Sequence, residues 1–222
     1  MSRLEELQKV NPQIEIKCVC DDSFLAYGRV VDVDPTEMIE MVKKSAPIPE
    51  TGSKYVPALE AIDTMPLAQE YNETLCGQLD EQWGLCWGHS STMNALEWHT
   101  CNEFNVGVTD LVLLLAKRGD LNKEGKLDSA KVKAFYLPEG KMIEVYSDTL
   151  HFCPCEVSKS GFSCVVGLQR GTNTDIDPEM KKDPLVTAKN KWLIAHEDMK
   201  GMVEHGCFPG IFGENWTIKT ID

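Results

Sequence analysis

The chain has 222 residues, of which 42% are hydrophobic and 26% charged, values that are typical of a globular protein. Its 22 lysine and arginine residues against 35 aspartate and glutamate residues give a net charge of −13. Nucleic-acid phosphates and anionic lipids repel such a charge, and no cluster of five or more basic residues offsets it. We therefore expect neither nucleic acid nor a membrane as a partner.

Cysteine usage and the N-terminus indicate the compartment. Nine cysteines are an odd number, and the chain is too long to depend on a disulfide framework, so reduced thiols in a cytoplasm are expected. The Cys-x-Cys pairs at Cys18 and Cys153 lack the two-residue gap of a zinc knuckle, which favours buried thiols over a structural zinc site. The polar N-terminus is not a secretory signal. The sequence predicts a cytoplasmic protein.

The first third of the chain mixes short elements. The β-branched run 29–33 predicts a strand, and Asp34 before Pro35 is typical of a helix start. That helix should end before Pro47, and the loop-forming composition of 46–53 follows it. A second helix is expected from Pro66 to about Leu75.

From Gln82 onward, short apolar runs separated by turn residues predict an antiparallel barrel or sandwich. Polar connections are expected at 119–129 and 172–183, and 206–213 is expected to be a tail that packs on the domain or on a second subunit. We interpret residues 1–222 as a single domain, with a mixed α/β part at 1–80 and the barrel and tail at 82–222. The predicted strands cover 84–91, 94–99, 103–108, 111–117, 131–137, 141–146, 150–157, 162–169 and 191–195.

The predicted strand 94–99 carries the most informative residues. Alternation places Glu97 and His99 on one face, and Glu103 follows after a short turn, where it can rejoin that face. Two carboxylates and an imidazole suit a divalent transition metal such as Zn, Mn or Fe. The alternative is that this polar face points outward to solvent. Against it, ionisable groups that face a barrel interior are costly unless they are paired or bound to a metal.

A second segment contains a Pro-x-Gly turn at Pro138, a later turn at 147–149, and His151 after it. Together, Glu-x-His-x-x-x-Glu, Pro-x-Gly and the later His resemble the two-part metal signature of the cupin superfamily. The resemblance implies a double-stranded β-helix, a mainly β, antiparallel barrel with helices contributed from the N-terminal part. It also implies one divalent metal ion on Glu97, His99, Glu103 and His151, although Glu97 stands where the family usually has His.

The run 24–31, Phe-Leu-Ala-Tyr-Gly-Arg-Val-Val, is similar to the opening of ureidoglycolate lyases, which are also cupins. The whole chain resembles an uncharacterised bacterial cupin family of about this length, through 94–103, 109–115, 170–174 and 190–193. Because cupins often pair their sheets, the resemblance implies a homodimer.

Several further residues are candidates for a site. Glu144 and Tyr146 share a face of one strand, and they would be a proton carrier and a substrate donor if that face is the interior; an outer, solvated face is equally compatible. His89 could join the site or be a satisfied core or edge histidine. Asn94 could neighbour the ligand or only start its strand.

Lys191 and Arg170 are the cations expected to hold a substrate carboxylate, with a purely surface role as the alternative. A thiol nucleophile at Cys101 or Cys153 is conceivable beside the two histidines, but a metal explains the glutamates as well. The leading hypothesis is a metal-dependent lyase or isomerase acting on a small hydroxylated, carboxylated metabolite, a ureido acid, sugar or sugar acid. The alternative is a non-catalytic cupin that senses a sugar or sugar acid.

Overall fold

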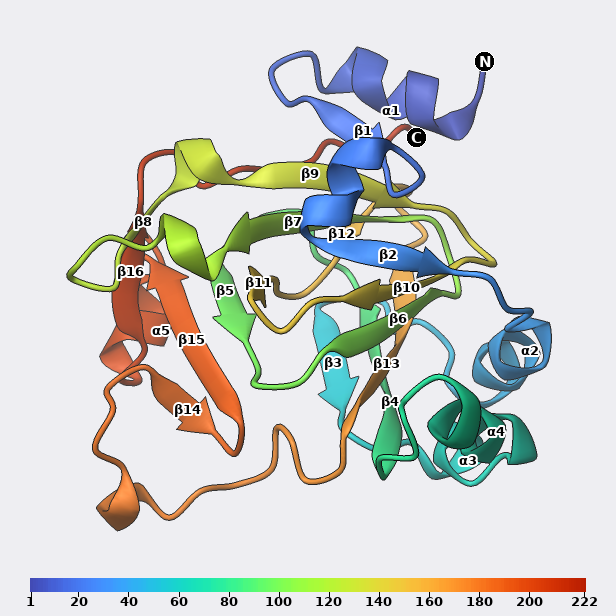
Figure 1. The fold of residues 1–222 in the computed structure, drawn as a ribbon. Coiled ribbons are helices and arrows are strands. Elements are labelled where there is room, and N and C mark those ends of the chain that lie inside the picture. The colour runs from blue at the N-terminus through green and yellow to red at the C-terminus, as the bar shows by residue number, and fades with distance from the viewer.

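Two β-sheets face each other across an apolar interior in the computed structural model, which describes residues 1–222 (Figure 1). The larger sheet has the strand order β2-β10-β6-β13-β4-β3, and all its neighbours are antiparallel. Its strands are β2 (Gly28–Val31), β10 (Met142–Val145), β6 (Glu103–Gly107), β13 (Phe162–Gln169), β4 (Glu81–Gly88) and β3 (Ser53–Val56).

The facing sheet has the order β1-β9-β7-β11, and β12 also pairs with β7. Only its β1–β9 pair is parallel. Its strands are β1 (Ile16–Cys18), β9 (Lys133–Leu137), β7 (Leu111–Lys117), β11 (Thr149–Leu150) and β12 (Cys155–Glu156). Two curled sheets around one interior form a barrel of the jelly-roll type, the arrangement found in cupins.

The alternation of side chains along the strands defines the interior. In β7, Leu111, Leu113 and Leu115 pack inside the barrel, whereas Val112 and Leu114 pack on the opposite face of the sheet. Both faces of this strand are covered, so the strand is apolar at nearly every position. The same alternation decides which residues of the polar strands reach the interior.

Helices cover the outside of the larger sheet, where α2, α3 and α4 gather at one end of the molecule (Figure 1). They are α2 (Thr36–Ser45), α3 (Glu60–Asp63) and α4 (Pro66–Thr74). The Asp34 carboxylate accepts a hydrogen bond from the Thr36 N–H at 3.0 Å, where α2 begins. Trp83 of β4 packs under the helices, and its indole N–H donates to Asn72 Oδ1 at 2.9 Å. This bond fixes α4 against the sheet.

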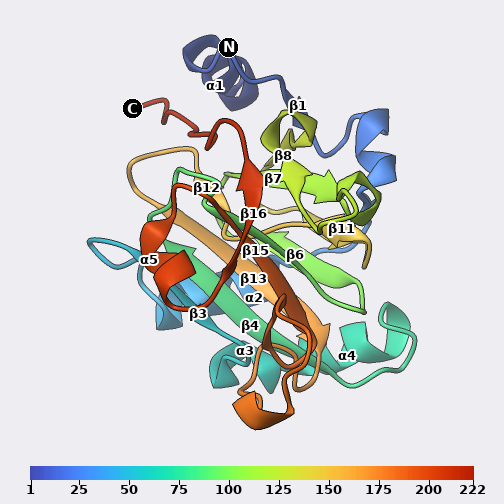
Figure 2. The same cartoon turned by 90° about the vertical axis from the view of Figure 1, so that its left-hand side faces the viewer.

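A third sheet, of order β14-β15-β16-β8 with β5 beside β15, covers the outside of the facing sheet (Figure 2). Its strands are β14 (Val186–Ala188), β15 (Lys191–His196), β16 (Phe208–Phe212), β8 (Leu127–Asp128) and β5 (Ala95–Trp98). Helix α5 (Lys200–Glu204) connects β15 to β16, and α1 (Arg3–Val10) lies beside the C-terminus. Asn11 joins the two ends of the chain through hydrogen bonds to the Lys219 backbone. The helices are too short or too polar to span a lipid bilayer.

The predicted mainly β, cupin-type barrel with helices in the N-terminal third is confirmed. Several local expectations were wrong. The expected tail forms β16, and the single strand expected at 150–157 is two short pieces, β11 and β12. The loop expected at 46–53 is present up to residue 52, and the unpredicted edge strand β3 begins at Ser53. Cys18 and Cys20, expected as reduced thiols, form a disulfide, while the other seven cysteines are free.

Candidate metal centre

Strand β5 positions the first two residues of the site. Leu96 and Trp98 pack into the cluster outside the facing sheet, so Glu97 and the following His99 project from the opposite face of the strand. Both are buried, with exposed fractions of 8% and 1%. The predicted shared face therefore points inward, and the alternative of a solvated face is wrong.

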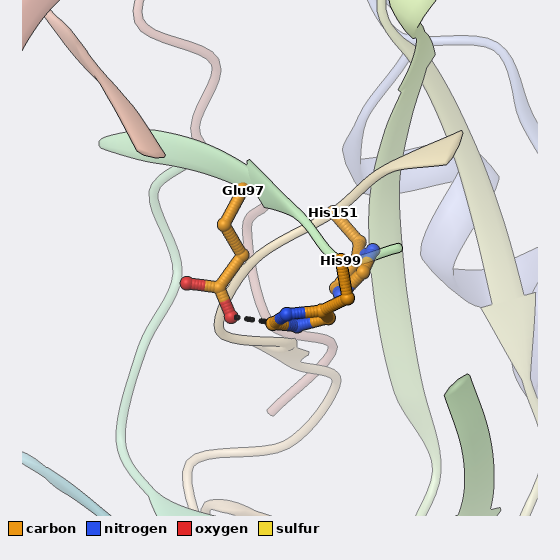
Figure 3. Close-up of side chains that lie close together, drawn as sticks. All are labelled: Glu97, His99 and His151. Atoms are coloured by element: carbon orange, nitrogen blue, oxygen red, sulfur yellow. Dashed lines mark ion pairs between the residues drawn. The ribbon is translucent and has the colours of Figure 1, made fainter. Parts of the chain in front are cut away.

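His151 reaches this face through a backbone bridge to Glu97. The Glu97 N–H donates to the His151 carbonyl at 2.6 Å, and the His151 N–H donates to the Glu97 carbonyl at 2.9 Å. Figure 3 shows the three side chains converging from the two segments. Donor atoms of Glu97, His99 and His151 all lie within 4.8 Å of one another.

Glu103, the fourth predicted ligand, comes from β6. Phe104 and Val106 of this strand pack under the helices, so Glu103 and Asn105 face the interior. Glu103 lies outside the three-residue set, but its Oε2 is 3.5 Å from His99 Nε2 and 3.2 Å from His151 Nε2. Asn105 donates to its other oxygen at 2.9 Å. Glu103 is thus held against both imidazoles.

Hydrogen bonds outside the cluster fix both imidazole rings. His99 Nδ1 donates to the Asn190 carbonyl at 2.7 Å, and His151 Nδ1 donates to the Thr149 carbonyl at 3.0 Å. Each Nε2 atom is therefore left for the cluster, and His99 Nε2 is buried without a hydrogen-bond partner. Metal-bound histidines are usually oriented in this way by a partner on the other ring nitrogen. These residues fit a divalent metal ion.

The charges within the cluster are strongly coupled. Burial alone would raise the pKa of Glu103, but the charges of the two histidines and the hydrogen bond with His151 hold it well below its ordinary value. Burial alone would lower the pKa of His151, but the Glu103 carboxylate outweighs it and raises the pKa of His151 to about 9. Without a metal, a proton on His151 therefore compensates the buried carboxylate.

A cavity of about 250 Å³ opens beside the cluster. Glu97, Glu103 and His151 line it together with two cations, Lys54 and Lys191. Lys191 forms an ion pair with Glu97. The neutral polar groups on its wall are Ser53, Tyr55, Asn105 and Asn173, and the apolar ones include Leu113, Phe152 and Val166.

Of the four predicted substrate-binding residues, the structure places only Lys191 in this cavity. Arg170 instead pairs with Asp63 and Asp80, each at 3.0 Å, near the helices. His89 contacts Glu156 at 2.7 Å and the Pro49 carbonyl at 3.1 Å, so both its ring nitrogens are satisfied away from the cluster. Asn94 has a left-handed backbone, with φ of 58°, directly before β5 and contacts Asn215.

The two predicted catalytic residues also lie outside the cavity. Ile143 and Val145 of β10 fill the barrel interior, so Glu144 points to the outer face. There it accepts hydrogen bonds from Arg29 at 2.5 Å and Asn102 at 2.6 Å. Tyr146 follows the strand and lies near Lys117. Glu144 therefore lies on the outer face, the alternative considered for it, because alternation in β10 assigns the interior to Ile143 and Val145.

Some residues near the site were missed from the sequence. Tyr55 lies on β3, a short strand directly after the expected loop that was not predicted. Its hydroxyl accepts a hydrogen bond from the Asn173 side chain at 3.0 Å. Asn105 could have been found, because it is two residues after Glu103 on one strand. Asn190 contacts His99 through its backbone carbonyl, and because every residue has a carbonyl, the sequence could not indicate this contact.

Comparison with known proteins gives a family and a set of distant structures. Residues 16–216 match a family described as a domain of unknown function, DUF4867. No curated protein matches the chain. Matching solved structures include an oxalate decarboxylase studied for proton-coupled electron transfer, with 13% identity over 58% of this chain and a TM-score of 0.35. Another is the Bacillus subtilis oxalate decarboxylase studied for its Mn(II) centres, with 11% identity over 58% and a TM-score of 0.33. This chain spans only 28% of the length of either protein.

Proposed function

This chain belongs to the DUF4867 family, and from its buried Glu97–His99–His151 cluster we propose that it is a metal-dependent lyase or isomerase acting on a small hydroxylated, carboxylated metabolite. The observation that carries the proposal is the unpartnered Nε2 atom of His99, buried beside two carboxylates and a second imidazole. A buried polar atom without a partner is costly, and a Zn, Mn or Fe ion would satisfy it.

When bound, such an ion supplies Lewis acidity, which polarises a substrate carbonyl or hydroxyl and acidifies the neighbouring proton. Glu97, His99 and His151 would hold the ion, and Glu103 is placed to join them. The hydrogen bond that Asn105 donates to Glu103, and those that the Asn190 and Thr149 carbonyls accept from His99 and His151, keep these three side chains oriented.

The remaining cavity residues suit an anionic, hydroxylated ligand. The ammonium groups of Lys54 and Lys191 give the cavity local positive charge in a chain whose net charge is −13. Burial raises the pKa of Tyr55, and the charges of Glu103 and Glu97 add to this, so its hydroxyl stays protonated and can donate to a ligand oxygen. Leu113, Phe152 and Val166 give the same cavity apolar surface.

Because Glu144 lies outside the cavity, a residue that lines the cavity must transfer the proton. Lys191 Nζ lies beside the cluster and is the best placed group to hold or move a proton near a bound ligand. The resemblance to ureidoglycolate lyases supports carbon–nitrogen cleavage, and a proton shift between adjacent carbons is the isomerase counterpart.

The test begins with ligand discovery. The full chain, loaded with Zn, Mn or Fe, is screened by thermal shift against ureido acids, sugar acids and ketoses, and each stabilising compound is then followed by NMR in water and in D₂O. We expect at least one carboxylated compound to stabilise the protein and to be cleaved, isomerised or deuterated at carbon. Strong stabilisation by a compound that remains chemically unchanged would overturn the enzyme hypothesis and support a binding protein.

Two cations provide a matched pair of variants for the same screen. Lys191→Met should weaken binding of a carboxylated ligand by about tenfold or more, because it removes a cation from the cavity. Arg170→Met removes a cation that pairs with Asp63 and Asp80 elsewhere and should leave ligand affinity unchanged. Equal losses in the two variants would contradict the assigned binding cavity.

A further inference from the structure

Two free thiols meet in the wall of the cavity. Cys86 lies within β4, Cys153 follows His151 by two residues, and their sulfur atoms are 4.0 Å apart. Both side chains line the cavity, and Cys153 is also 3.7 Å from the Ser53 hydroxyl. Neither thiol is used by the metal centre described above.

The other cysteines do not compete for this contact. Cys164 is opposite Cys86 in the β4–β13 register, but it is fully buried and its thiol is directed to the Val165 carbonyl at 3.4 Å. Cys155 belongs to the cluster outside the facing sheet, on the other side of its segment. Cys101 contacts the Asn190 side chain. Cys153 is therefore the thiol that faces Cys86 in the cavity.

The backbone around the pair allows the sulfurs to approach. A disulfide requires an S–S distance of about 2.05 Å, so the sulfurs must close by roughly 2 Å. Cys86 is held on both sides, by β3 and by β13. Cys153 lies in the irregular segment between β11 and β12, where no sheet hydrogen bonds fix it. Residues 152–154 can take up part of this movement, and the remainder is passed along the chain to His151.

We propose that Cys86 and Cys153 form a reversible disulfide when a hydroperoxide enters the cavity. The Cys153 sulfur, partly exposed, attacks the peroxide and the O–O bond breaks, giving a sulfenic acid and one molecule of water or alcohol. The Cys86 sulfur then attacks the sulfenic sulfur, the S–O bond breaks, and a second water leaves as the S–S bond forms. The two thiols lose two electrons and two protons, and the peroxide is reduced by the same two electrons.

The bond would change the cavity beside the metal centre. It ties the segment that follows His151 to β4 and draws Cys153 toward the larger sheet. A shift of this segment displaces His151 relative to Glu97 and His99, so the oxidised protein should bind a divalent metal more weakly. This consequence rests on the proposed metal centre, whereas the disulfide itself does not.

The experiment treats the full chain with hydrogen peroxide and maps its thiols by mass spectrometry of peptides prepared without reductant. We expect a linked peptide pair containing Cys86 and Cys153 that dithiothreitol separates. Separate sulfinic or sulfonic acids at the two positions, or a Cys86–Cys164 link, would overturn the proposal. The affinity for Zn²⁺, measured by chelator competition before and after oxidation, should fall by about tenfold or more.

Variants separate the possible failures. Cys153→Ser should abolish both the linked peptide and the oxidant effect on Zn²⁺ affinity, whereas Cys207→Ser, at another partly buried free thiol, should change neither. Cys86→Ala serves as the partner variant if Cys86→Ser does not fold. A disulfide that forms in a protein unable to bind Zn²⁺ in either redox state would leave this proposal standing and contradict the proposed function instead.

Discussion

Glu97 and His151 exchange two backbone hydrogen bonds, at 2.6 and 2.9 Å, although one residue belongs to the third sheet and the other follows β11 of the facing sheet. This single bridge brings the two halves of the sequence motif together. It also connects the covering layer to the barrel, so the donor cluster forms only when both layers have folded. We therefore expect metal binding and global folding to be linked, with bound metal raising the stability of the protein.

Asn190 provides a test of how the surroundings orient His99. Its side chain accepts hydrogen bonds from Thr100 N–H at 2.9 Å and from the Thr100 hydroxyl at 2.6 Å, while its carbonyl accepts from His99. Asn190→Ala releases the turn, and we expect the affinity for Zn²⁺ to fall by about tenfold, measured by chelator competition.

Asn94→Ala is the matched control for this variant. Asn94 and Asn190 have similar left-handed backbones, with φ of 58° and 54°, so alanine strains the backbone alike at both positions. Only Asn190 supports a cluster residue. If the two variants have the same Zn²⁺ affinity, the turn at Asn190 does not position His99.

Glu81 predicts a pH dependence of stability. Burial, and then the charge of Asp80, raise the pKa of its carboxyl from 4.5 to about 7, despite Arg170 nearby. The folded state therefore holds this proton more tightly than the unfolded state, and the stability it confers below pH 4.5 is lost as the pH rises through 7. Glu81→Gln should be more stable than the wild type by about 1 to 2 kcal/mol at pH 8, and by much less at pH 5.

Urea unfolding of both proteins at the two pH values measures this difference. Glu73→Gln, at an exposed carboxyl that contacts Gln69, serves as the control and should show no comparable change between pH 5 and pH 8. The same Glu81→Gln effect at both pH values would show that the Glu81 carboxyl does not titrate in this range.

Gly84 tests the packing of the edge strand that carries Tyr55. A Cβ atom at Gly84 would collide with the backbone carbonyls of Val56 and Pro57, which follow Tyr55. Gly84→Ala should cost about 1 to 3 kcal/mol of unfolding free energy and displace β3 from the cavity. Gly119→Ala meets nothing within 4 Å and should stay within about 0.5 kcal/mol of the wild type in the same urea titration. Equal midpoints for the two variants would contradict this close approach.

Much of the fold could be predicted from local pattern. Strands with apolar residues on two covered faces, such as β7 and β13, are long and regular, so periodicity and turn residues locate them well. The short strands β1, β3, β8 and β14 could not be found in this way, because two to four residues carry too little pattern and the pairing partner decides their conformation.

Alternation predicts which side chains of a strand share a face, but it predicts a site residue only where the inward face of that strand is also known. Alternation gave the shared face of Glu97 and His99, whereas its inward direction is shown by the packing of Leu96 and Trp98 outside the facing sheet. For Glu144, the apolar neighbours Ile143 and Val145 left both faces open, and only the sheet partners show that those two residues fill the interior. Arg170 has the surface role that was the alternative for it, and its partners, Asp63 and Asp80, come from distant segments that sequence spacing does not bring together. The homodimer stays a prediction.

The metal content of the chain tests the central claim most directly. The wild type, purified without chelator or added metal, should contain about one Zn, Mn or Fe ion per chain by elemental analysis. His99→Ala and His151→Ala should lose it, because each removes an oriented Nε2 donor, and His205→Ala, at an exposed histidine, should retain it. Two results together would contradict the account: the wild type neither contains nor takes up these metals, and the three variants are as stable as the wild type.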